Sequence, residues 1–405
     1  MARVLYLTQV LPYPLNTGAR VRQYYVLRYL ARQHEVTLVS FVRGDDQPEH
    51  IAHLKTICRT VHVVPMQRSR WRDGRAVVKG LLTRSPIVIT RDEIESMQQA
   101  LARLLASESF DVIHADQVSM SRYGLMGEKV RHILDLHNAM YVVTERLAAH
   151  EHNPVKRRVF EREARALARY EAELCAKYDQ VTFVTEADRD LIEQQIVRWK
   201  VRLPERRFTT IPICIDPSDK HPIQPAPSPH RITVLGVMFW PPNAEGALWF
   251  AQEIWPRIHA QQPHLTFTVI GKNPPDYLVK EHGTNGIEVL GFVPELESVL
   301  AETAVFVVPL RAGGGMRVKI LDTWSWGLPI VSTSIGAEGI DICDGENILI
   351  ADDPESFAAA VLRAVRDPGL NQRLRFNGRR WVEEKYDWKI VYRAWDEVYA
   401  KMLRS

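Results

Sequence analysis

The residues best suited to chemistry lie in one stretch, FVVPLRAGGGMRVKILDTWSWGLPIVSTSIGAEG, which runs from Phe306 to Gly339. Its pattern predicts a buried strand, three consecutive glycines, and a helix from about Met316 with Arg317 and Lys319 in its first turn. Glycines let the backbone approach a ligand closely, and the free N–H groups and positive dipole end of a helix start attract anions. We therefore predict that a diphosphate binds here, at the carboxyl edge of a parallel sheet.

Asp322 lies further along the same predicted helix and could accept hydrogen bonds from hydroxyl groups. At about 100° per residue, it lies about 60° around the axis from Lys319 and about 140° from Arg317. An ion pair between Lys319 and Asp322 within the helix is the structural alternative to a ligand contact. The sequence leaves both interpretations of Asp322 open.

Short apolar runs alternate with helical patterns along the chain, which is typical of βα units and a parallel sheet. The predicted strands are 4–8, 36–41, 61–64, 112–114, 132–136, 180–184, 209–211, 232–236, 265–270, 287–290, 305–308 and 330–332, and the longer predicted helices include 19–32, 92–106, 154–177 and 244–260. A proline-rich stretch at 217–229 fits neither a helix interior nor a central strand. We therefore predict an α/β fold with two doubly wound, Rossmann-like domains, at 1–212 and 231–385, joined by a linker at 213–230 and facing a cleft.

Polar residues follow two predicted strands of the first domain, where open α/β sheets bind ligands. His137 and Asn138 come just after the strand at 132–136, and His114 and Asp116 come at the end of the strand at 112–114. A hydrogen-bonded histidine within the structure is the alternative for each of the two histidines. On the ligand interpretation, His114, Asp116 and Asn138 lie on the acceptor side.

The first predicted loop and a later turn hold further candidates. Thr17 and Gly18 precede the helix at 19–32, and Gly18 suits close approach to a phosphate or an acceptor. Arg20 lies where a cation is unfavourable unless an anion is near, so we place it with Thr17 on the acceptor side. Glu338 follows the strand at 330–332 and is a candidate donor contact, with a surface turn as the alternative.

Four motifs then carry a family resemblance: LPYPLNTGARVRQYYVLRYLARQHEVTLVS, LDLHNAMY, VLGVMFWPPNAEGALWF and PLRAGGGMRVKILDTWSWGLPIVSTSIGAEGI. The chain resembles a retaining GT-B glycosyltransferase of family 4, the group 1 type, over nearly all of its length. The resemblance implies a C-terminal helix at 386–405 that returns to the first domain. It also implies transfer of a sugar from a nucleotide-diphosphate sugar to an acceptor hydroxyl with retention, in surface glycan or glycoconjugate assembly.

The resemblance also assigns roles, with departures from the family pattern. Many members carry two glutamates eight positions apart; here the ribose-binding one falls on Asp322 and the sugar-binding one on Gly314, which has no side chain. The predicted donor-side residues are Gly18, Gly236, Gly313, Gly314, Gly315, Met316, Arg317, Lys319, Asp322 and Glu338. The predicted catalytic residues are His137, near the donor sugar, together with Arg317 and Lys319, which replace the cations usually found near residues 237–240.

The expected chemistry needs no cofactor and no metal. Negative charge builds on the departing diphosphate, and preorganised N–H donors and cations stabilise it. The leaving phosphate then takes the acceptor proton, as is thought for retaining members of the family. The acidic pairs Asp45-Asp46 and Asp352-Asp353 fall in polar turns, so we predict no metal site.

Composition limits the remaining choices. The net charge of +3 over 405 residues gives no reason to expect a nucleic-acid partner, and four widely spaced cysteines fit a reducing compartment. We find no signal peptide and no apolar run of the roughly 18 residues that span a bilayer, so we expect a cytoplasmic protein. The segment from Met66 to Arg91 carries seven cations around Trp71 and apolar pairs, which fits either peripheral contact with anionic lipid or a solvated basic face.

Two other functions stay open. A glycosyltransferase-like binding subunit with weak or no activity is favoured by Gly314 in place of the usual acid. A sugar-nucleotide epimerase would share the architecture, but the sequence places no acid pair for elimination. The acceptor is expected to be a glycan, a lipid-linked molecule or a small molecule, and the nucleotide base and the donor sugar are not determined.

Overall fold

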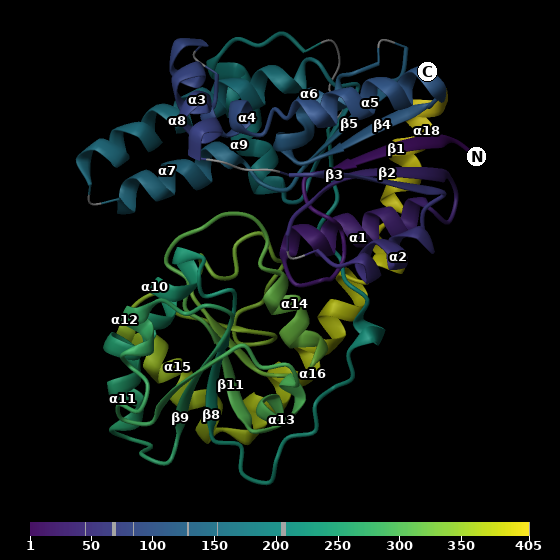
Figure 1. Cartoon of the computed structure of the whole chain (residues 1–405). Coiled ribbons are helices and arrows are strands. Elements are labelled where there is room, and N and C mark those ends of the chain that lie inside the picture. The colour runs from purple at the N-terminus through teal and green to yellow at the C-terminus, as the bar shows by residue number, and fades with distance from the viewer. Residues whose placement is uncertain are drawn as a thin grey trace. The chain divides into compact units, whose positions relative to one another are not determined.

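The computed structural model describes residues 1–44, 46–66, 70–83, 85–127, 129–151, 153–203 and 208–404 (Figure 1). Asp45 lies outside these residues, as do two cations of the basic segment, Arg68 and Arg84, and the side chains of residues 70–72 and 81 in that segment. The chain forms two compact units. The N-terminal unit holds Met1–Cys214, Gly314–Met316 and Trp388–Ser405, and the C-terminal unit holds Ile215–Gly313 and Arg317–Asp387.

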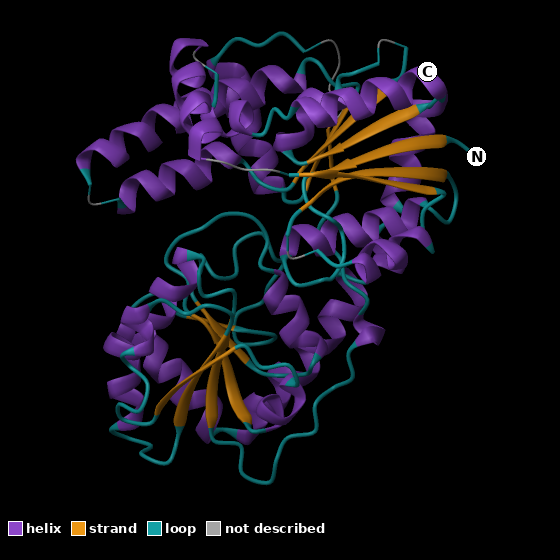
Figure 2. Ribbon diagram, viewed as in Figure 1, coloured by secondary structure: helices purple, strands orange, loops and turns teal. Residues whose placement is uncertain are grey.

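The N-terminal unit is built on a seven-stranded parallel sheet with strand order β3-β2-β1-β4-β5-β6-β7 (Figure 2). Its strands are β1 (Arg3–Thr8), β2 (Glu35–Val42), β3 (Thr60–Pro65), β4 (Val112–Asp116), β5 (Arg131–Leu136), β6 (Gln180–Phe183) and β7 (Phe208–Thr210). The central strands β1 and β4 are almost wholly buried, as expected for a sheet covered by helices on both faces. Each predicted strand of this half is found, shifted by a residue or two.

Helices cover this sheet and carry the loops of the candidate site. They are α1 (Gly18–Leu30), α2 (Pro48–Lys55), α3 (Arg70–Thr83), α4 (Ile87–Arg91), α5 (Glu95–Ser107), the short η1 (Val118–Met120), α6 (Ser121–Gly124), α7 (Met140–His150), α8 (Pro154–Cys175) and α9 (Glu186–Arg198). Asn153 caps α8 by accepting hydrogen bonds from two backbone N–H groups, and a proline fills the first helical position.

The end of the chain packs on the N-terminal unit as α17 (Trp388–Val391) and α18 (Ala394–Arg404). Trp388, Trp395 and Tyr399 are buried there. The hydroxyl of Tyr29 on α1 donates to Asp396 at 2.9 Å. These contacts confirm the predicted return of the C-terminal helix to the first domain.

The C-terminal unit is built on a six-stranded parallel sheet with order β10-β9-β8-β11-β12-β13. Its strands are β8 (Arg231–Leu235), β9 (Thr266–Ile270), β10 (Ile287–Gly291), β11 (Thr303–Val308), β12 (Ile330–Ser332) and β13 (Leu349–Ile350). Its helices are η2 (Pro217–Asp219), α10 (Pro241–Trp249), η3 (Phe250–Ile254), α11 (Trp255–His259), α12 (Asp276–Val279), α13 (Leu296–Ala301), α14 (Val318–Ser325), α15 (Pro354–Arg366) and α16 (Pro368–Lys385).

One expectation for this unit needs correction. The helix predicted at 244–260 is interrupted by the π-helical turn η3, because Pro256 has no N–H to continue the α-helical hydrogen bonds. The proline-rich stretch, predicted as a linker, makes contacts with the C-terminal unit. It contains η2, and its backbone N–H groups at Ile223 and Ala226 each donate at 2.8 Å, to the carbonyls of Trp326 and Ala301.

Each unit has its own hydrophobic core. Among the described helices, none combines the length and the apolar composition that crossing a membrane requires.

Candidate functional site

The predicted diphosphate site lies at the start of α14, after the carboxyl end of β11. Arg317 is the N-cap residue and Val318 begins the helix, so the helix starts about two residues later than the sequence pattern predicts. Gly313 has a φ of 121° and Gly315 a φ of 73°, conformations that favour glycine. The first turn of α14 contains no acidic residue, and the side chain of the N-cap residue Arg317 makes no capping hydrogen bond to the helix.

Lys319, in the first turn of α14, points back over the end of β8. Its Nζ donates to Oδ1 of Asn243 at 2.9 Å, and a Cβ atom added to Gly236 would lie 2.9 Å from the same Nζ. A Cβ on Gly313 would lie 3.0 Å from Nη2 of Arg317. The structure thus brings the two predicted cations beside two of the predicted glycines, which leave room for them.

The charge of Lys319 is poorly compensated by the protein. Burial, and after it the positive charge of Arg317, lower the pKa of Lys319 from 10.5 to about 7. Its hydrogen-bond acceptor, the Asn243 side chain, is neutral. Two neighbouring cations that depress protonation in this way favour an anionic ligand. Sequence reasoning missed Asn243, although an Asn early in a helix just after a strand is a detectable signal.

Asp322 forms its ion pair with Lys220 instead of Lys319. The structural alternative considered from the sequence, a pair within the helix, is therefore not what the structure contains. The side chain of Asp322 is 26% exposed, so it can still contact a ligand.

The remaining donor-side candidates lie nearby in the chain. Glu338 is half-buried in the turn after β12, at the carboxyl edge of the same sheet. Gly314, Gly315 and Met316 are grouped with the N-terminal unit, so the structure does not place them in the same unit as Lys319.

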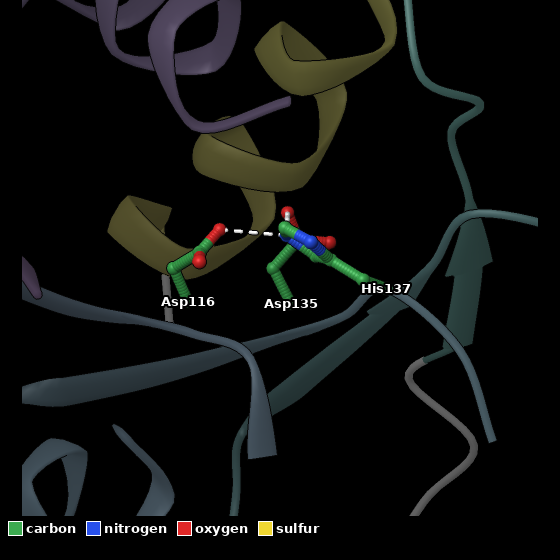
Figure 3. Close-up of side chains that lie close together, drawn as sticks. All are labelled: Asp116, Asp135 and His137. Carbon is green, nitrogen blue, oxygen red and sulfur yellow. Dashed lines mark hydrogen bonds and ion pairs between the residues drawn. The ribbon is translucent and has the colours of Figure 1, made fainter. Parts of the chain in front are cut away.

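A second group of polar residues, which we call the β4–β5 cluster, lies at the carboxyl ends of β4 and β5. It comprises Asp116, Asp135 and His137 (Figure 3). Nε2 of His137 lies 2.8 Å from Oδ1 of Asp116, and Nδ1 lies 3.1 Å from the amide nitrogen of Gln117. Both ring nitrogens of His137 therefore have protein partners. Asn138 follows directly in the chain, at the start of the loop to α7.

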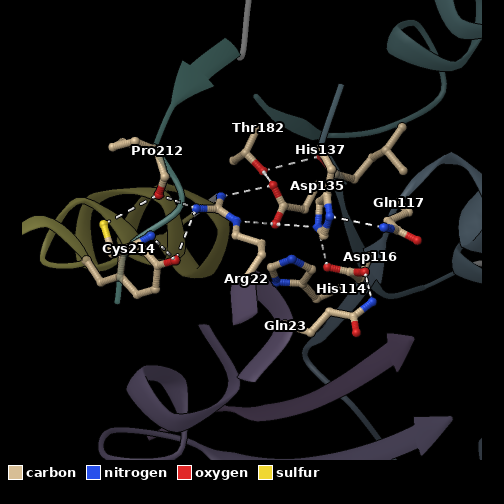
Figure 4. A network of polar contacts seen from close by, with 12 residues as sticks. Arg22, Gln23, His114, Asp116, Gln117, Asp135, His137, Thr182, Pro212 and Cys214 are labelled. Carbon is tan, nitrogen blue, oxygen red and sulfur yellow. Dashed lines mark hydrogen bonds and ion pairs between the residues drawn. The ribbon is translucent and has the colours of Figure 1, made fainter. Parts of the chain in front are cut away.

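Arg22 of α1 completes the β4–β5 cluster (Figure 4). Its guanidinium binds both oxygens of Asp135, at 3.0 and 3.1 Å, and also donates to the carbonyl of Pro212 at 2.7 Å and to the Tyr392 hydroxyl at 3.4 Å. Arg22 thereby joins α1 and β5 to the segment after β7 and to the C-terminal residues of the same unit. Sequence reasoning missed this residue, whose partners lie up to 370 positions away.

The two aspartates of this cluster differ in pKa. Burial raises the pKa of Asp135, but the charges of Arg22 and His137 outweigh it and hold the pKa at about 2. Burial raises the pKa of Asp116, and the neighbouring His137 offsets this only in part. Asp135 is therefore a carboxylate, whereas Asp116 holds its proton more readily.

The cluster has the spacing of a metal site, since one ligand atom from each of its three residues lies within 4.8 Å of the others. However, Arg22 occupies both oxygens of Asp135, and His137 and Gln23 occupy the two oxygens of Asp116. A guanidinium already supplies the cation. These residues fit a hydrogen-bonded ion-pair network better than a metal centre.

The other acceptor-side candidates have protein partners of their own. His114 is fully buried, its Nδ1 lies 2.9 Å from the Tyr399 hydroxyl, and its ring contacts Tyr6; this environment corresponds to the structural alternative for His114. Arg20 forms a buried ion pair with Asp46 at 2.9 Å, which supplies the anion that its position demands.

The first loop and the loop after β5 are fixed by hydrogen bonds to the backbone. Thr17 caps α1, which begins at Gly18. Oδ1 of Asp188 accepts from the N–H of Ala139 at 2.8 Å, and the two oxygens of Glu171 accept from the next two N–H groups at 2.8 and 3.1 Å. These buried carboxyl groups hold the loop that carries His137, and burial raises the pKa of Glu171 to about 8. The sequence pattern gives no sign of either contact.

Comparison with known proteins places both units in one family. The family profile described as Glycosyl transferase 4-like domain matches residues 17–206, and the profile described as Glycosyl transferases group 1 matches residues 229–367. An uncharacterized 44.6 kDa protein in the cps region of Klebsiella pneumoniae is 23% identical over 407 residues, covering 97% of this chain and 98% of that protein. The lipopolysaccharide core biosynthesis glycosyltransferase LpsE of Rhizobium meliloti (strain 1021) is 29% identical over 126 residues, 30% of this chain and 37% of LpsE.

Solved structures share the fold at low sequence identity. HepE of Anabaena, in complex with UDP and glucose, has a TM-score of 0.66 and 14% identity over 99% of this chain and 100% of that one. Sucrose-phosphate synthase of Thermosynechococcus elongatus has a TM-score of 0.68 and 16% identity over 99% of each chain. The predicted GT-B fold is thereby confirmed, and with a family profile on each of its two units the chain belongs to the group 1 glycosyltransferases.

Proposed function

We propose that this protein transfers a sugar from a nucleotide-diphosphate sugar to an acceptor hydroxyl with retention, in the assembly of a surface glycan or glycoconjugate. The observation that carries the proposal is the pair of cations at the start of α14, where burial, and after it the charge of Arg317, lower the pKa of Lys319 and its hydrogen-bond acceptor is a neutral amide. A diphosphate would relieve this repulsion. The cps region of one relative and the lipopolysaccharide role of another support the glycan setting.

In this proposal the chain acts mainly through electrostatics. Arg317, Lys319 and backbone N–H groups at the start of α14 bind the diphosphate and stabilise the charge that develops on it as the sugar leaves. Asp322 accepts hydrogen bonds from the ribose hydroxyls. The leaving phosphate takes the proton of the acceptor hydroxyl, which attacks on the face that the diphosphate leaves, so the anomeric configuration is retained. These roles require neither a metal nor a cofactor.

His137 contributes through position and charge instead of removing a proton, because both its ring nitrogens already have partners in Asp116 and Gln117. The buried carboxyl groups of Glu171 and Asp188, which accept hydrogen bonds from the following loop, keep His137 in place. Near a donor sugar, such a rigid, polar group would stabilise charge without reorganising.

We also propose peripheral contact of α3 with anionic lipid at the inner face of the membrane. Val78 and Leu82 of α3 are 57% and 80% exposed, and Arg75 and Lys79 lie exposed between and beside them. An open cavity of about 1430 Å³ lies between this helix and residues 90–98, which run from the end of α4 into the start of α5. Exposed apolar side chains among cations favour the surface of an anionic bilayer, where a lipid-linked acceptor would be found.

Binding and turnover test the proposal separately. Thermal unfolding should be measured with UDP, GDP, dTDP and ADP, since ligand at about 100 times its Kd stabilises the fold by ~2.7 kcal/mol. Sugar transfer should then be assayed with the preferred donor, and Arg317→Ala and Asp322→Asn should abolish it in folded protein. Nucleotide binding without transfer to a broad acceptor panel would instead support a binding subunit, and a changed sugar without an acceptor would support an epimerase.

A further inference from the structure

Lys220 lies in the proline-rich stretch but is fixed against α14. Its carbonyl accepts from Nη1 of Arg379 at 2.8 Å, and the same guanidinium nitrogen donates to the carbonyl of Ser325, near the end of α14. Three residues later, the N–H of Ile223 donates to the carbonyl of Trp326. The stretch is therefore held on both sides of Lys220, whose position is built into the C-terminal unit.

The side chain of Lys220 has two contacts on α14 and at its end. Its ammonium pairs with Oδ1 of Asp322 and lies 5.1 Å from the centre of the Trp326 ring. Among the residues that the structure describes, none donates a hydrogen bond to Oδ2 of Asp322. Lys220 and Asp322 are 29% and 26% exposed, so a ligand can reach the free oxygen.

We infer that Lys220 is a positioning residue for the ribose of the nucleotide. It holds Oδ1 of Asp322 and so turns Oδ2 outward as an acceptor for a ribose hydroxyl. This inference rests on the proposed function, because it takes Asp322 as the ribose-binding carboxylate.

The position of the charges supports this role. Asp322 lies about 7.5 Å along the helix from Arg317, at five residues of 1.5 Å each. A bare carboxylate at that distance would repel a diphosphate held at the helix start. Lys220 neutralises Asp322 while leaving one of its oxygens available. The alternative is that Lys220 competes with the ribose and weakens binding.

The test compares Lys220→Ala with a matched control, Lys385→Ala. Lys385 lies in the same unit, pairs with Asp341 and contacts the ring of Trp381 at 4.1 Å, so it repeats both contacts of Lys220 at another place. Affinity is measured by calorimetry for UDP, GDP and ADP and for their 2′-deoxy counterparts. The readout is the ratio of the two dissociation constants for the preferred base.

We expect the unchanged protein to prefer the ribonucleotide about tenfold or more, as for a hydroxyl bound to a charged acceptor. Lys220→Ala should weaken ribonucleotide binding about fivefold and deoxyribonucleotide binding much less, so the ratio falls. Lys220→Arg should retain the ratio, and Lys385→Ala should leave both affinities unchanged. In an Asp322→Asn background, Lys220→Ala should have no further effect on the ratio.

An equal loss for both sugars would show that Lys220 acts only through its charge, and an unchanged or increased affinity would show that it is inert or competes with the ribose. Each of these results would overturn the inference while leaving the diphosphate site standing. If the unchanged protein binds no nucleoside diphosphate, the proposed function fails and the inference fails with it.

Discussion

Lys319 offers the sharpest test of the diphosphate site, because its charge changes near neutral pH. Burial and the charge of Arg317 lower its pKa to about 7 in the ligand-free protein. A bound diphosphate adds negative charge beside the ammonium and raises this pKa again. Binding is therefore coupled to protonation of Lys319.

The direction in which pH changes the affinity follows from the pKa of Lys319 in the ligand-free and the diphosphate-bound protein. Below about pH 7, Lys319 is already protonated and the affinity is at its highest. As the pH rises from about 7 towards the pKa of the bound state, the free protein must take up a proton to bind, and the affinity falls. One proton gives at most about a tenfold loss per pH unit. Because Lys319 is only partly buried, solvent screening reduces this loss of affinity. We therefore expect the affinity to fall about threefold to fivefold per pH unit.

Stability should depend on pH in the opposite way. In the unfolded chain Lys319 has its usual pKa near 10.5, so between about 7 and 10.5 the unfolded state binds more protons than the folded one. The free energy of unfolding of the ligand-free protein therefore gains a contribution as the pH rises from 7. The limit is about 1.4 kcal/mol per pH unit, and we expect roughly half of it after screening.

The assay is calorimetric titration between pH 6 and 9 with a nucleotide-diphosphate sugar, whose phosphate diesters do not titrate in this range. Lys319→Arg keeps the positive charge at every pH of the series. Its affinity should therefore stay nearly constant where that of the unchanged protein falls. Parallel pH profiles for the two proteins, or an affinity that rises above pH 7, would refute the reasoning.

Further perturbations test other parts of the molecule. Arg317→Ala should weaken nucleoside diphosphate binding by about tenfold to a hundredfold in calorimetry, because a charge-assisted contact is lost. Tyr392→Phe removes the hydroxyl that contacts the guanidinium of the β4–β5 cluster and should lower the free energy of unfolding in urea by about 1–2 kcal/mol. Gly378→Ala would place a Cβ 2.3 Å from a buried indole carbon and should cost about 1–3 kcal/mol in the same measurement. Leu82→Asp should weaken sedimentation with phosphatidylglycerol vesicles by about tenfold, whereas Leu403→Asp, a similar change on α18, should not.

The sequence was sufficient for the fold because local patterns determine it. Apolar runs of strand length alternate with helical patterns, so both sheets and every strand except the two-residue β13 could be predicted. The glycines before α14 also mark a loop in the structure, whereas diphosphate binding there stays a prediction. The break in the helix at 244–260 was also predictable, since Pro256 lies within the predicted range. Element ends shifted by one or two residues, which placed Arg317 at the N-cap instead of in the first turn.

The partners of the site residues could not be predicted because they are distant in the sequence. Lys220 meets Asp322 across 102 positions, and Arg22 meets Asp135 across 113. A sequence pattern gives the face of a helix on which Asp322 lies, but not which loop returns to that face. The same reason explains why a pair between Lys319 and Asp322 was considered from spacing alone, whereas tertiary contacts give each a different partner.

The starts of α7 and α14 differ in the side chains that lie beside them, and the difference supports binding of an anionic ligand at α14. At α7, the buried side chains of Glu171 and Asp188 accept hydrogen bonds from the N–H groups of residues 139–141, so the protein itself satisfies the donors at the start of the helix. Burial raises the pKa of Glu171 to about 8, so near pH 7 it does so mainly as a neutral acid. At α14, the first turn has no acidic residue and carries Lys319 next to Arg317. Cations at the positive end of a helix destabilise it unless an anion is present. The protein uses its own side chains to satisfy the N–H groups at the start of α7, whereas at α14 the hydrogen-bond acceptor of Lys319 is the neutral amide of Asn243. A ligand that brings negative charge best explains a lysine at this position.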